Sequence, residues 1–317
     1  MSKQRVYSLW AVWLITGLYV FLFFNNREWH KKDALRHDMM PYYSYLPAVF
    51  IDKDITLNSD SARRNYFYSW SLEATARPGR IVRMSMGVAV MQAPFFLLAH
   101  ITAKPLGHKA DGFNGHYFFF IILGCVFYAI TGLWILRWLL RRYFDDLIVA
   151  ITLVFIACGT NLLYYTIYEG PMSHVYTFFL VSAVLALTVK WHNTPKWKWA
   201  ILPGLLTGII ILVRPVNGLV LLVPALYNIY SKDSFITKLK HVKKHRLQII
   251  AATVVACIAV LPQFLYWKYL SGNYYFYLFK VKHQRFNKMF SPIFEYSYRP
   301  YVILLVDSLV HFNEIQR

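Results

Sequence analysis

A small set of polar and aromatic residues in this sequence could take part in chemistry. They combine carboxylates, a guanidinium and an imidazole with neighbouring tyrosines and asparagines, in the stretches "HDMMPYYSYLP", "NLLYYTIYEGPMSHVY" and "LVRPVNG". The candidates are Asp38, Tyr42, Tyr43, Asn161, Tyr165, Glu169, His174, Arg214 and Asn217.

The carboxylate and the guanidinium have complementary chemical roles. A carboxylate within hydrogen-bond reach of a hydroxyl can act as a general base and remove its proton. The planar guanidinium of arginine donates two hydrogen bonds to a phosphate at once and can stabilise charge that develops on a leaving phosphate. Asp38 is therefore the candidate base and Arg214 the candidate phosphate ligand, while the tyrosines offer flat surfaces for a sugar ring or a polyprenyl chain. This chemistry suits transfer from a phosphate-bearing lipid donor.

Each candidate also has a structural interpretation. Asp38 could be a solvated loop carboxylate or a helix cap, and Tyr42 and Tyr43 could be anchors at a membrane interface. Glu169 could lie in water beyond a helix end, and His174 could be a satisfied polar residue at the start of a helix. Arg214 is harder to explain this way. It lies between the apolar stretches "GIIILV" and "GLVLL", and an ionisable residue at membrane depth is costly.

The composition describes the kind of protein that must position these residues. Of 317 residues, 57% are hydrophobic and 15% are charged, and the mean hydropathy is +0.38. Soluble globular proteins carry roughly 25% charged residues, so the composition argues against a soluble domain. The net charge of +19 is spread over many loops, which favours anionic membrane lipids as partners and argues against nucleic acid. The sequence has no HExxH pattern, so no metal is demanded, although a divalent ion is left open.

The apolar residues are grouped into runs that predict an all-α, polytopic transmembrane bundle of about seven or eight spans. The first run is longer than the core of a signal peptide, so we expect an uncleaved helix with a cytoplasmic N-terminus. The expected spans cover residues 7–24, 116–136, 146–167, 172–190, 199–213, 216–230 and 247–269, with an eighth near 299–311.

Charge decides the status of the apolar segment 84–103, which Pro94 interrupts. Short basic loops stay in the cytoplasm. Both 137–142 and 231–246 are short and basic, and they fall on the cytoplasmic side if 84–103 lies in the interface or re-enters, so we expect this segment in the outer interface. The segments 199–213 and 216–230 are short for spans and flank Arg214, so a hairpin that dips into the membrane is an alternative.

The expected organisation has four parts. A first transmembrane helix (1–24) precedes a long outer loop with juxtamembrane helices (25–115). A transmembrane bundle (116–269) precedes an outer aromatic and basic segment with a last span (270–317). In or near that last segment the basic residues form either a surface that faces lipid headgroups or a set of diphosphate contacts; they are Lys268, Lys280, Lys282, Arg285 and Lys288.

These motifs resemble those of the GT-C superfamily of polytopic glycosyltransferases, which includes protein O-mannosyltransferases and the aminoarabinose transferase of lipid A. The resemblance lies in "DMMPYYSYLP", "MGVAVMQAPFFLLAH", "NLLYY…E…MSHVY" and "RPVN", covers roughly residues 5–270, and is closest to a bacterial branch. It implies an inverting transferase of the bacterial inner membrane, with Asp38 as catalytic carboxylate and a juxtamembrane helix at 84–103. It also implies a polyprenyl-phosphate sugar as donor and a lipid, glycan or protein as acceptor.

The chain departs from that family in length. GT-C enzymes have about eleven or more spans and often a further outer domain, so a truncated chain with only the catalytic half is one expectation. Two other functional classes stay open. A transporter or lipid flippase would favour internal repeats and broken helices near the midplane, and a non-catalytic remnant would fit the short C-terminus.

Overall fold

The computed structural model describes residues 6–31, 33–58, 71–73, 76–82 and 84–274. This part of the chain is mostly helical. Its described strands, β1 (Ser71–Glu73) and β2 (Arg80–Val82), form one antiparallel hairpin in which Ser71 pairs with Val82. The last expected span near 299–311 and the basic residues from Lys280 onward lie outside the described residues.

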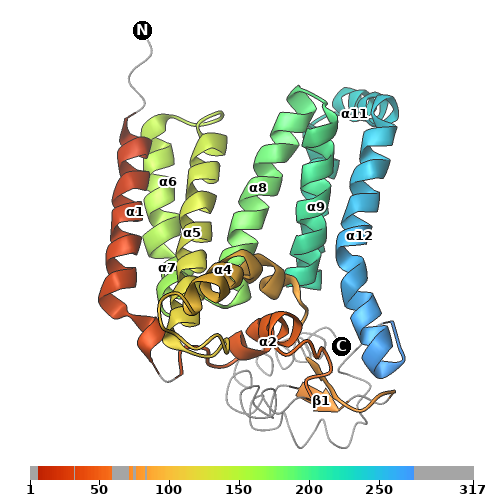
Figure 1. Cartoon of the computed structure of the whole chain (residues 1–317). Coiled ribbons are helices and arrows are strands. Elements are labelled where there is room, and N and C mark those ends of the chain that lie inside the picture. The colour runs from red at the N-terminus through yellow and green to blue at the C-terminus, as the bar shows by residue number, and fades with distance from the viewer. Residues whose placement is uncertain (1–5, 32, 59–70, 74–75, 83, 275–317) are drawn as a thin grey trace, which may run out of the picture. The chain divides into compact units, whose positions relative to one another are not determined.

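Four of the described helices are long and apolar enough to cross a membrane. They are α1 (Tyr7–Asn26), α5 (Gly115–Leu140), α8 (Ser173–Asn193) and α12 (Arg246–Ser271), and a 3-10 turn extends the first to His30. The helices α6 (Asp146–Gly159) and α9 (Trp197–Val213) run alongside them (Figure 1). Several apolar helices are therefore present, as expected of a membrane protein, but four rather than seven or eight have the length of a full span.

We expected a single helix over 146–167, but this was wrong, because the structure divides the segment into two helices. After Gly159 the backbone of Thr160 is extended, with ψ at 177°, and a second short helix, α7, covers Leu162–Ile167. The hydroxyl of Thr160 accepts a hydrogen bond from the backbone N–H of Leu162. A 14-residue helix is about 21 Å long, whereas a span needs about 20 residues. The break turns the chain at the end of α6.

The expectation of one continuous helix over 216–230 was also wrong. After Arg214 the chain forms the 3-10 helix η2 (Pro215–Leu221) and then one turn of α-helix, α10 (Leu222–Leu226). Proline at the first position of η2 cannot donate to the preceding turn, so α9 ends at Val213. This broken connection agrees better with the alternative of a short hairpin than with two spans.

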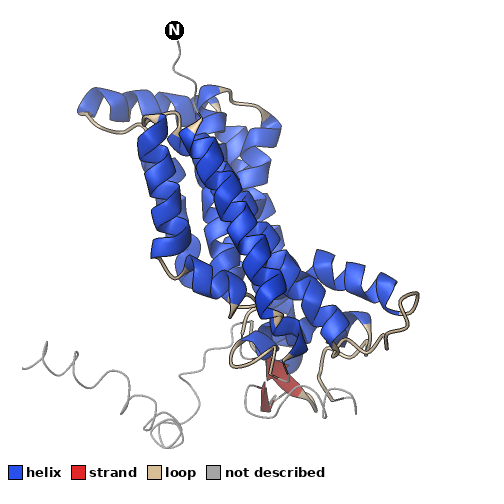
Figure 2. Cartoon of the chain, turned by 90° about the vertical axis from the view of Figure 1, so that its left-hand side faces the viewer, coloured by secondary structure: helices blue, strands red, loops and turns tan. Residues whose placement is uncertain are grey.

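The two ends of the bundle differ in composition. The upper end in Figure 1 carries the start of α1, the basic segment 137–142 and α11 (Lys232–Lys244), which lies across the bundle axis. The lower end carries α2 (Met39–Phe50), α4 (Gly87–Ala103) and the β-hairpin, and the perpendicular view in Figure 2 shows the same separation. The two short basic segments therefore lie at one end of the bundle, and the candidate site residues lie at the other.

α4 crosses the lower end and packs directly on the end of α9. A Cβ added to Gly87 would lie 2.2 Å from the backbone of Leu212, so only glycine allows this approach. The hydroxyl of Ser85 donates to the Leu212 carbonyl, and the backbone N–H of Met86 donates to Oε1 of Gln263 in α12 at 2.7 Å. These contacts fix the apolar segment 84–103 crosswise under the bundle, and they hold the chain next to Arg214.

α9 and α12 approach each other through small residues. Gly204 and Gly208 face Ala252 and Ala256, and Cβ atoms on the two glycines would lie 2.4 and 2.7 Å from the two alanine carbonyl oxygens. Small residues spaced by four allow close backbone packing between membrane helices. Most of the remaining surface of α12 is exposed, with only 11% of its apolar window buried.

Polar side chains tie α1, α5 and α6 together at the upper end. The backbone N–H and the hydroxyl of Ser8 both donate to the Asp146 carboxylate, at 3.0 and 2.5 Å. Nε of Arg137 donates to the Ser8 hydroxyl at 2.9 Å, and Arg141 lies 3.6 Å from the same carboxylate. The acidic residue thus gathers three elements at a basic end.

Candidate functional site

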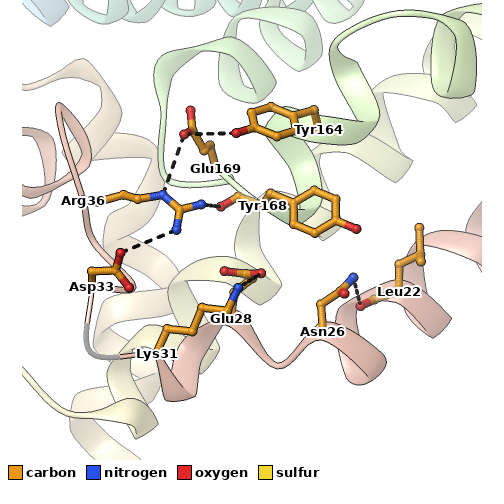
Figure 3. A network of polar contacts seen from close by, with 9 residues as sticks. All are labelled: Leu22, Asn26, Glu28, Lys31, Asp33, Arg36, Tyr164, Tyr168 and Glu169. Carbon is orange, nitrogen blue, oxygen red and sulfur yellow. Dashed lines mark hydrogen bonds and ion pairs between the residues drawn. The ribbon is translucent and has the colours of Figure 1, made fainter.

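At the lower end of the bundle, Arg36 connects the segment before α2 to the segment between α7 and α8. Its Nε lies 3.7 Å from a carboxylate oxygen of Glu169, and its NH2 group donates to the carbonyl oxygen of Tyr168 at 3.1 Å. Its remaining edge faces Asp33 at 3.8 Å, and the Tyr164 hydroxyl lies 3.4 Å from the same Glu169 oxygen (Figure 3). One guanidinium therefore binds the segment before α2 to the connection between α7 and α8.

This anchor places Asp38 at the lower end of the bundle. Asp38 occupies the N-cap position of α2, two residues after Arg36, but its side chain makes no cap hydrogen bond. The residue is half-buried, and its carboxylate makes no hydrogen bond or ion pair with any described residue. A helix-capping role therefore does not account for this carboxylate.

Glu169, His174 and Arg214 form a second charged group on neighbouring elements. The His174 ring stacks on the Tyr165 ring, with centroids 3.8 Å apart and planes 24° apart. The charges of Arg214 and Glu169 both act on the His174 imidazole. The α7–α8 connection and the end of α9 therefore both carry a charge that acts on this imidazole.

Arg214 is held by its backbone, and its guanidinium makes no hydrogen bond or ion pair within the described part of the chain. Its N–H donates to Ile210, and its carbonyl accepts from the N–H of Asn217. The Asn217 side chain in turn donates to the Thr177 hydroxyl at 3.1 Å, which joins η2 to α8. Asn217 thus fixes the turn after Arg214 in place.

The remaining predicted residues occupy different environments. Asn161 is exposed at the start of α7. Tyr42 is 4% exposed within the apolar core, and Tyr43 is fully buried, with its hydroxyl donating to the carbonyl of Gly112. Both tyrosine rings pack inside the protein, so their expected contact with a substrate requires that the substrate reach the interior side of α2.

Three residues at this site were missed in the sequence. Arg36 stands out only because it shares the stretch "LRHD" with Asp38. Gln92 is a polar residue within the apolar segment "MQAPFFLLAH"; it is buried, its Nε2 donates to Pro171 at 3.3 Å, and its Oε1 has no partner among the described residues. The hydroxyl of Ser173, next to His174, is likewise buried without a partner in the described chain. A polar side chain inside an apolar run is the signal that would have found Gln92.

The described residues contain no group of three or more His, Cys, Asp and Glu side chains that could hold a metal ion. The polar groups at this end are therefore the Asp38 carboxylate and the Arg214 guanidinium, neither with a hydrogen bond or ion pair to a described residue, and the His174 imidazole stacked on Tyr165. All three lie at the lower end of the apolar bundle.

The comparisons with known proteins identify no relative. No protein-family model matches the chain, and no curated protein and no solved structure is significantly similar to it.

Proposed function

We propose that the protein is a membrane glycosyltransferase that moves a sugar from a polyprenyl-phosphate donor to an acceptor hydroxyl. The observation that carries the proposal is the half-buried Asp38 carboxylate without a partner, at the same end of the bundle as the guanidinium of Arg214. A general base must be free to accept a proton, and a phosphate ligand must be free to donate hydrogen bonds. The resemblance of the surrounding motifs to GT-C enzymes supports the same reaction class.

In the proposed reaction the oxygen of the acceptor hydroxyl attacks the anomeric carbon of the sugar. Asp38 accepts the proton of that hydroxyl as the new bond forms. The bond from that carbon to the phosphate oxygen breaks, and the leaving polyprenyl phosphate takes the bonding electrons. Attack opposite the leaving group inverts the configuration at the carbon. Arg214 binds the leaving phosphate and stabilises its growing negative charge. His174 and Tyr165 provide a flat surface beside it.

The proposed topology puts this end on the outer face of the bacterial inner membrane, with a cytoplasmic N-terminus. The basic segment 137–142 and α11 then face the cytoplasm, in agreement with the positive-inside rule. In this arrangement α6 adds a crossing to the four long spans, and α9 with η2 and α10 forms a hairpin that dips into the membrane from the cytoplasmic side. The segment 84–103 lies in the outer interface.

The first experiment tests transfer directly. Purified protein is incubated with a panel of polyprenyl-phosphate sugars, and release of polyprenyl phosphate is measured with and without membrane extracts as a source of acceptor. Acceptor-dependent release from at least one donor is the expected result. Movement of intact donor across the bilayer, without release, would instead assign the protein to the flippases.

The second experiment tests the topology. Cys158 and Cys257 are exposed, so both are first replaced by serine, and single cysteines are then introduced at positions 38, 140 and 240. A membrane-impermeant maleimide is expected to label position 38 from outside intact cells, and positions 140 and 240 only after the membrane is opened. Labelling of position 38 from the cytoplasm alone would refute the proposal.

A further inference from the structure

The end of the bundle opposite the candidate site contains a basic cavity. It has a volume of about 560 Å³ and lies where the start of α9 meets the junction of α11 and α12. Its lining includes Trp197, Lys240, Lys243, Lys244 and Arg246, and none of the four cations is in an ion pair with a described residue. No acidic side chain lines it. An unneutralised cluster of this kind attracts a strongly anionic group.

A second cavity begins one turn further into the bundle on the same two helices. It has a volume of about 590 Å³ and an almost entirely apolar lining that includes Trp199, Ala200, Ile249 and Cys257. We call the two cavities the headgroup cavity and the acyl groove. On α9, Trp197 lines the headgroup cavity and Trp199 lines the acyl groove. Tryptophan favours the boundary between headgroups and hydrocarbon.

A single hydrogen bond links the walls of the two cavities. Nε1 of Trp191, which lines the acyl groove, donates at 2.8 Å to Oε1 of Gln248, which lines the headgroup cavity. The bond fixes α12 to the end of α8 and sets the level at which the lining changes from basic to apolar. One molecule with an anionic head and an apolar tail matches this change.

α11 has the properties of a helix that lies in a membrane surface. A capping box at Ser231 begins it, and its lysines other than Lys238 are exposed beside the exposed apolar residues Phe235, Ile236 and Leu239. Basic amphipathic helices of this kind lie at the boundary between headgroups and acyl chains and favour anionic lipids. The headgroup cavity therefore lies at the depth of the lipid phosphates.

Lys238 holds α11 in this position. The residue is 8% exposed, and its ammonium group donates to Nε2 of His192 at 2.5 Å and to the carbonyl oxygen of Pro224 at 2.7 Å. Because Lys238 is directed into the bundle, the neighbouring Lys240, Lys243 and Lys244 are left to face the headgroup cavity. The position of the cations is thus fixed by packing.

We propose that this end of the bundle binds one anionic phospholipid, with its phosphate in the headgroup cavity and an acyl chain in the acyl groove. The charge complementarity selects an anionic over a zwitterionic lipid, and the apolar groove selects a lipid over a soluble phosphate. The binding does not depend on sugar transfer at the opposite end.

The test is native mass spectrometry of the full-length, delipidated protein in neutral detergent, titrated with phosphatidylglycerol. The expected result is saturable binding of one lipid. Phosphatidylcholine is expected to bind at least tenfold more weakly, and glycerol phosphate is not expected to displace the lipid. Equal binding of phosphatidylcholine would overturn the headgroup assignment, and displacement by glycerol phosphate would overturn the role of the groove.

A matched pair of variants tests the cations. The double variant Lys243→Gln/Lys244→Gln is expected to weaken binding by about fivefold for each lysine removed, because each cation near an anionic lipid contributes about 1 kcal/mol. The control Lys104→Gln/Lys109→Gln removes the same charge from exposed positions at the other end and is expected to leave binding unchanged. Equal losses in both pairs would show a non-specific charge effect and refute the site.

A second pair tests the groove. Cys257→Phe fills the acyl groove and is expected to weaken phosphatidylglycerol binding at least tenfold, whereas Cys257→Ser is expected to preserve it. Both proteins are first compared by size-exclusion chromatography. Binding unchanged by the phenylalanine would refute the groove. A dimer that forms in delipidated protein and excludes the lipid would assign the surface to a second copy of the chain and also refute the proposal.

Discussion

Arg36 and Glu169 lie 3.7 Å apart, although 132 residues separate them in the sequence. Their side chains are 24% and 17% exposed, so water screens the pair only in part. The same guanidinium also binds the carbonyl of Tyr168. This contact is what holds the segment bearing Asp38 on the α7–α8 connection, and it gives the first test of the site.

Arg36→Gln is expected to lower the transfer rate about tenfold without unfolding the protein, because Asp38 loses its position but not its carboxylate. Glu169→Gln is expected to act in the same direction. A double-mutant cycle should give a coupling energy of up to about 1 kcal/mol, as for partly exposed ion pairs. Lys31→Gln is the control, because Lys31 pairs only with Glu28 in its own turn. Additive effects of the two changes would contradict a direct contact.

Arg214→Lys separates geometry from charge. Lysine keeps the positive charge but loses the planar fork that binds two phosphate oxygens. The expected result is a rise of about tenfold in KM for the polyprenyl-phosphate donor, with a smaller loss in kcat. Arg142→Lys, at an exposed position on the opposite end, serves as the control. An unchanged KM would remove Arg214 from the donor site.

The contact between α9 and α12 makes a prediction about stability. Gly204→Ala places a methyl group against the backbone of Ala252 and is expected to destabilise the protein by about 1–3 kcal/mol, as measured by thermal unfolding in detergent. Gly17→Ala is the matched control in α1, where a Cβ meets nothing within 4 Å, and a neutral or slightly stabilising effect is expected. Equal effects at the two positions would mean that the helices do not pack this closely.

A histidine cluster on and beside α11, made of His192, His241 and His245, predicts that the stability of this helix depends on pH. Burial, together with the positive charges of His245, Lys238 and Lys244, lowers the pKa of His241. The unfolded chain therefore takes up this proton first as the pH falls below about 6.5. The folded state therefore loses stability relative to the unfolded state as the pH falls from that value through the pKa of His241 in the folded protein.

Hydrogen exchange in α11 measures this effect. Exchange is expected to speed up between pH 7 and pH 5, after correction for the intrinsic pH dependence of exchange. In His241→Gln the acceleration is expected to be smaller, because glutamine does not titrate. The same acceleration in the variant would assign the effect to other groups.

The sequence predicted the helical class and the grouping of short basic segments because long apolar runs and charge asymmetry are local properties. It did not predict the break at Thr160 or the 3-10 turn after Arg214, since apolar composition continues through both. The spacing of hydrophobic residues in a sequence indicates which residues are buried. The breaks in these helices depend instead on which backbone groups form hydrogen bonds in the folded chain. Four of the described helices reach the length of a full span, and the count of seven or eight stays a prediction.

The candidate site was predictable in part. Glu169, His174 and Arg214 were placed together because topology sends the ends of α7 and α9 to the same side. Arg36 could not be found this way, because its partners are a distant carboxylate and a backbone carbonyl that only the folded chain brings near. Tyr43 shows the opposite difficulty. Its type suits a binding surface, but its burial follows from packing with Phe96 and Phe113.

The most direct test of the central claim compares Asp38→Asn with Asp145→Asn in the polyprenyl-phosphate release assay. Both aspartates occupy helix N-cap positions without a side-chain cap bond, at opposite ends of the bundle, so the two changes remove equivalent charges. Asp38→Asn is expected to lower transfer at least about 100-fold in a protein that still inserts and unfolds normally, because the base is lost. Asp145→Asn is expected to retain full activity. Transfer by Asp38→Asn at the unmodified rate would contradict the account.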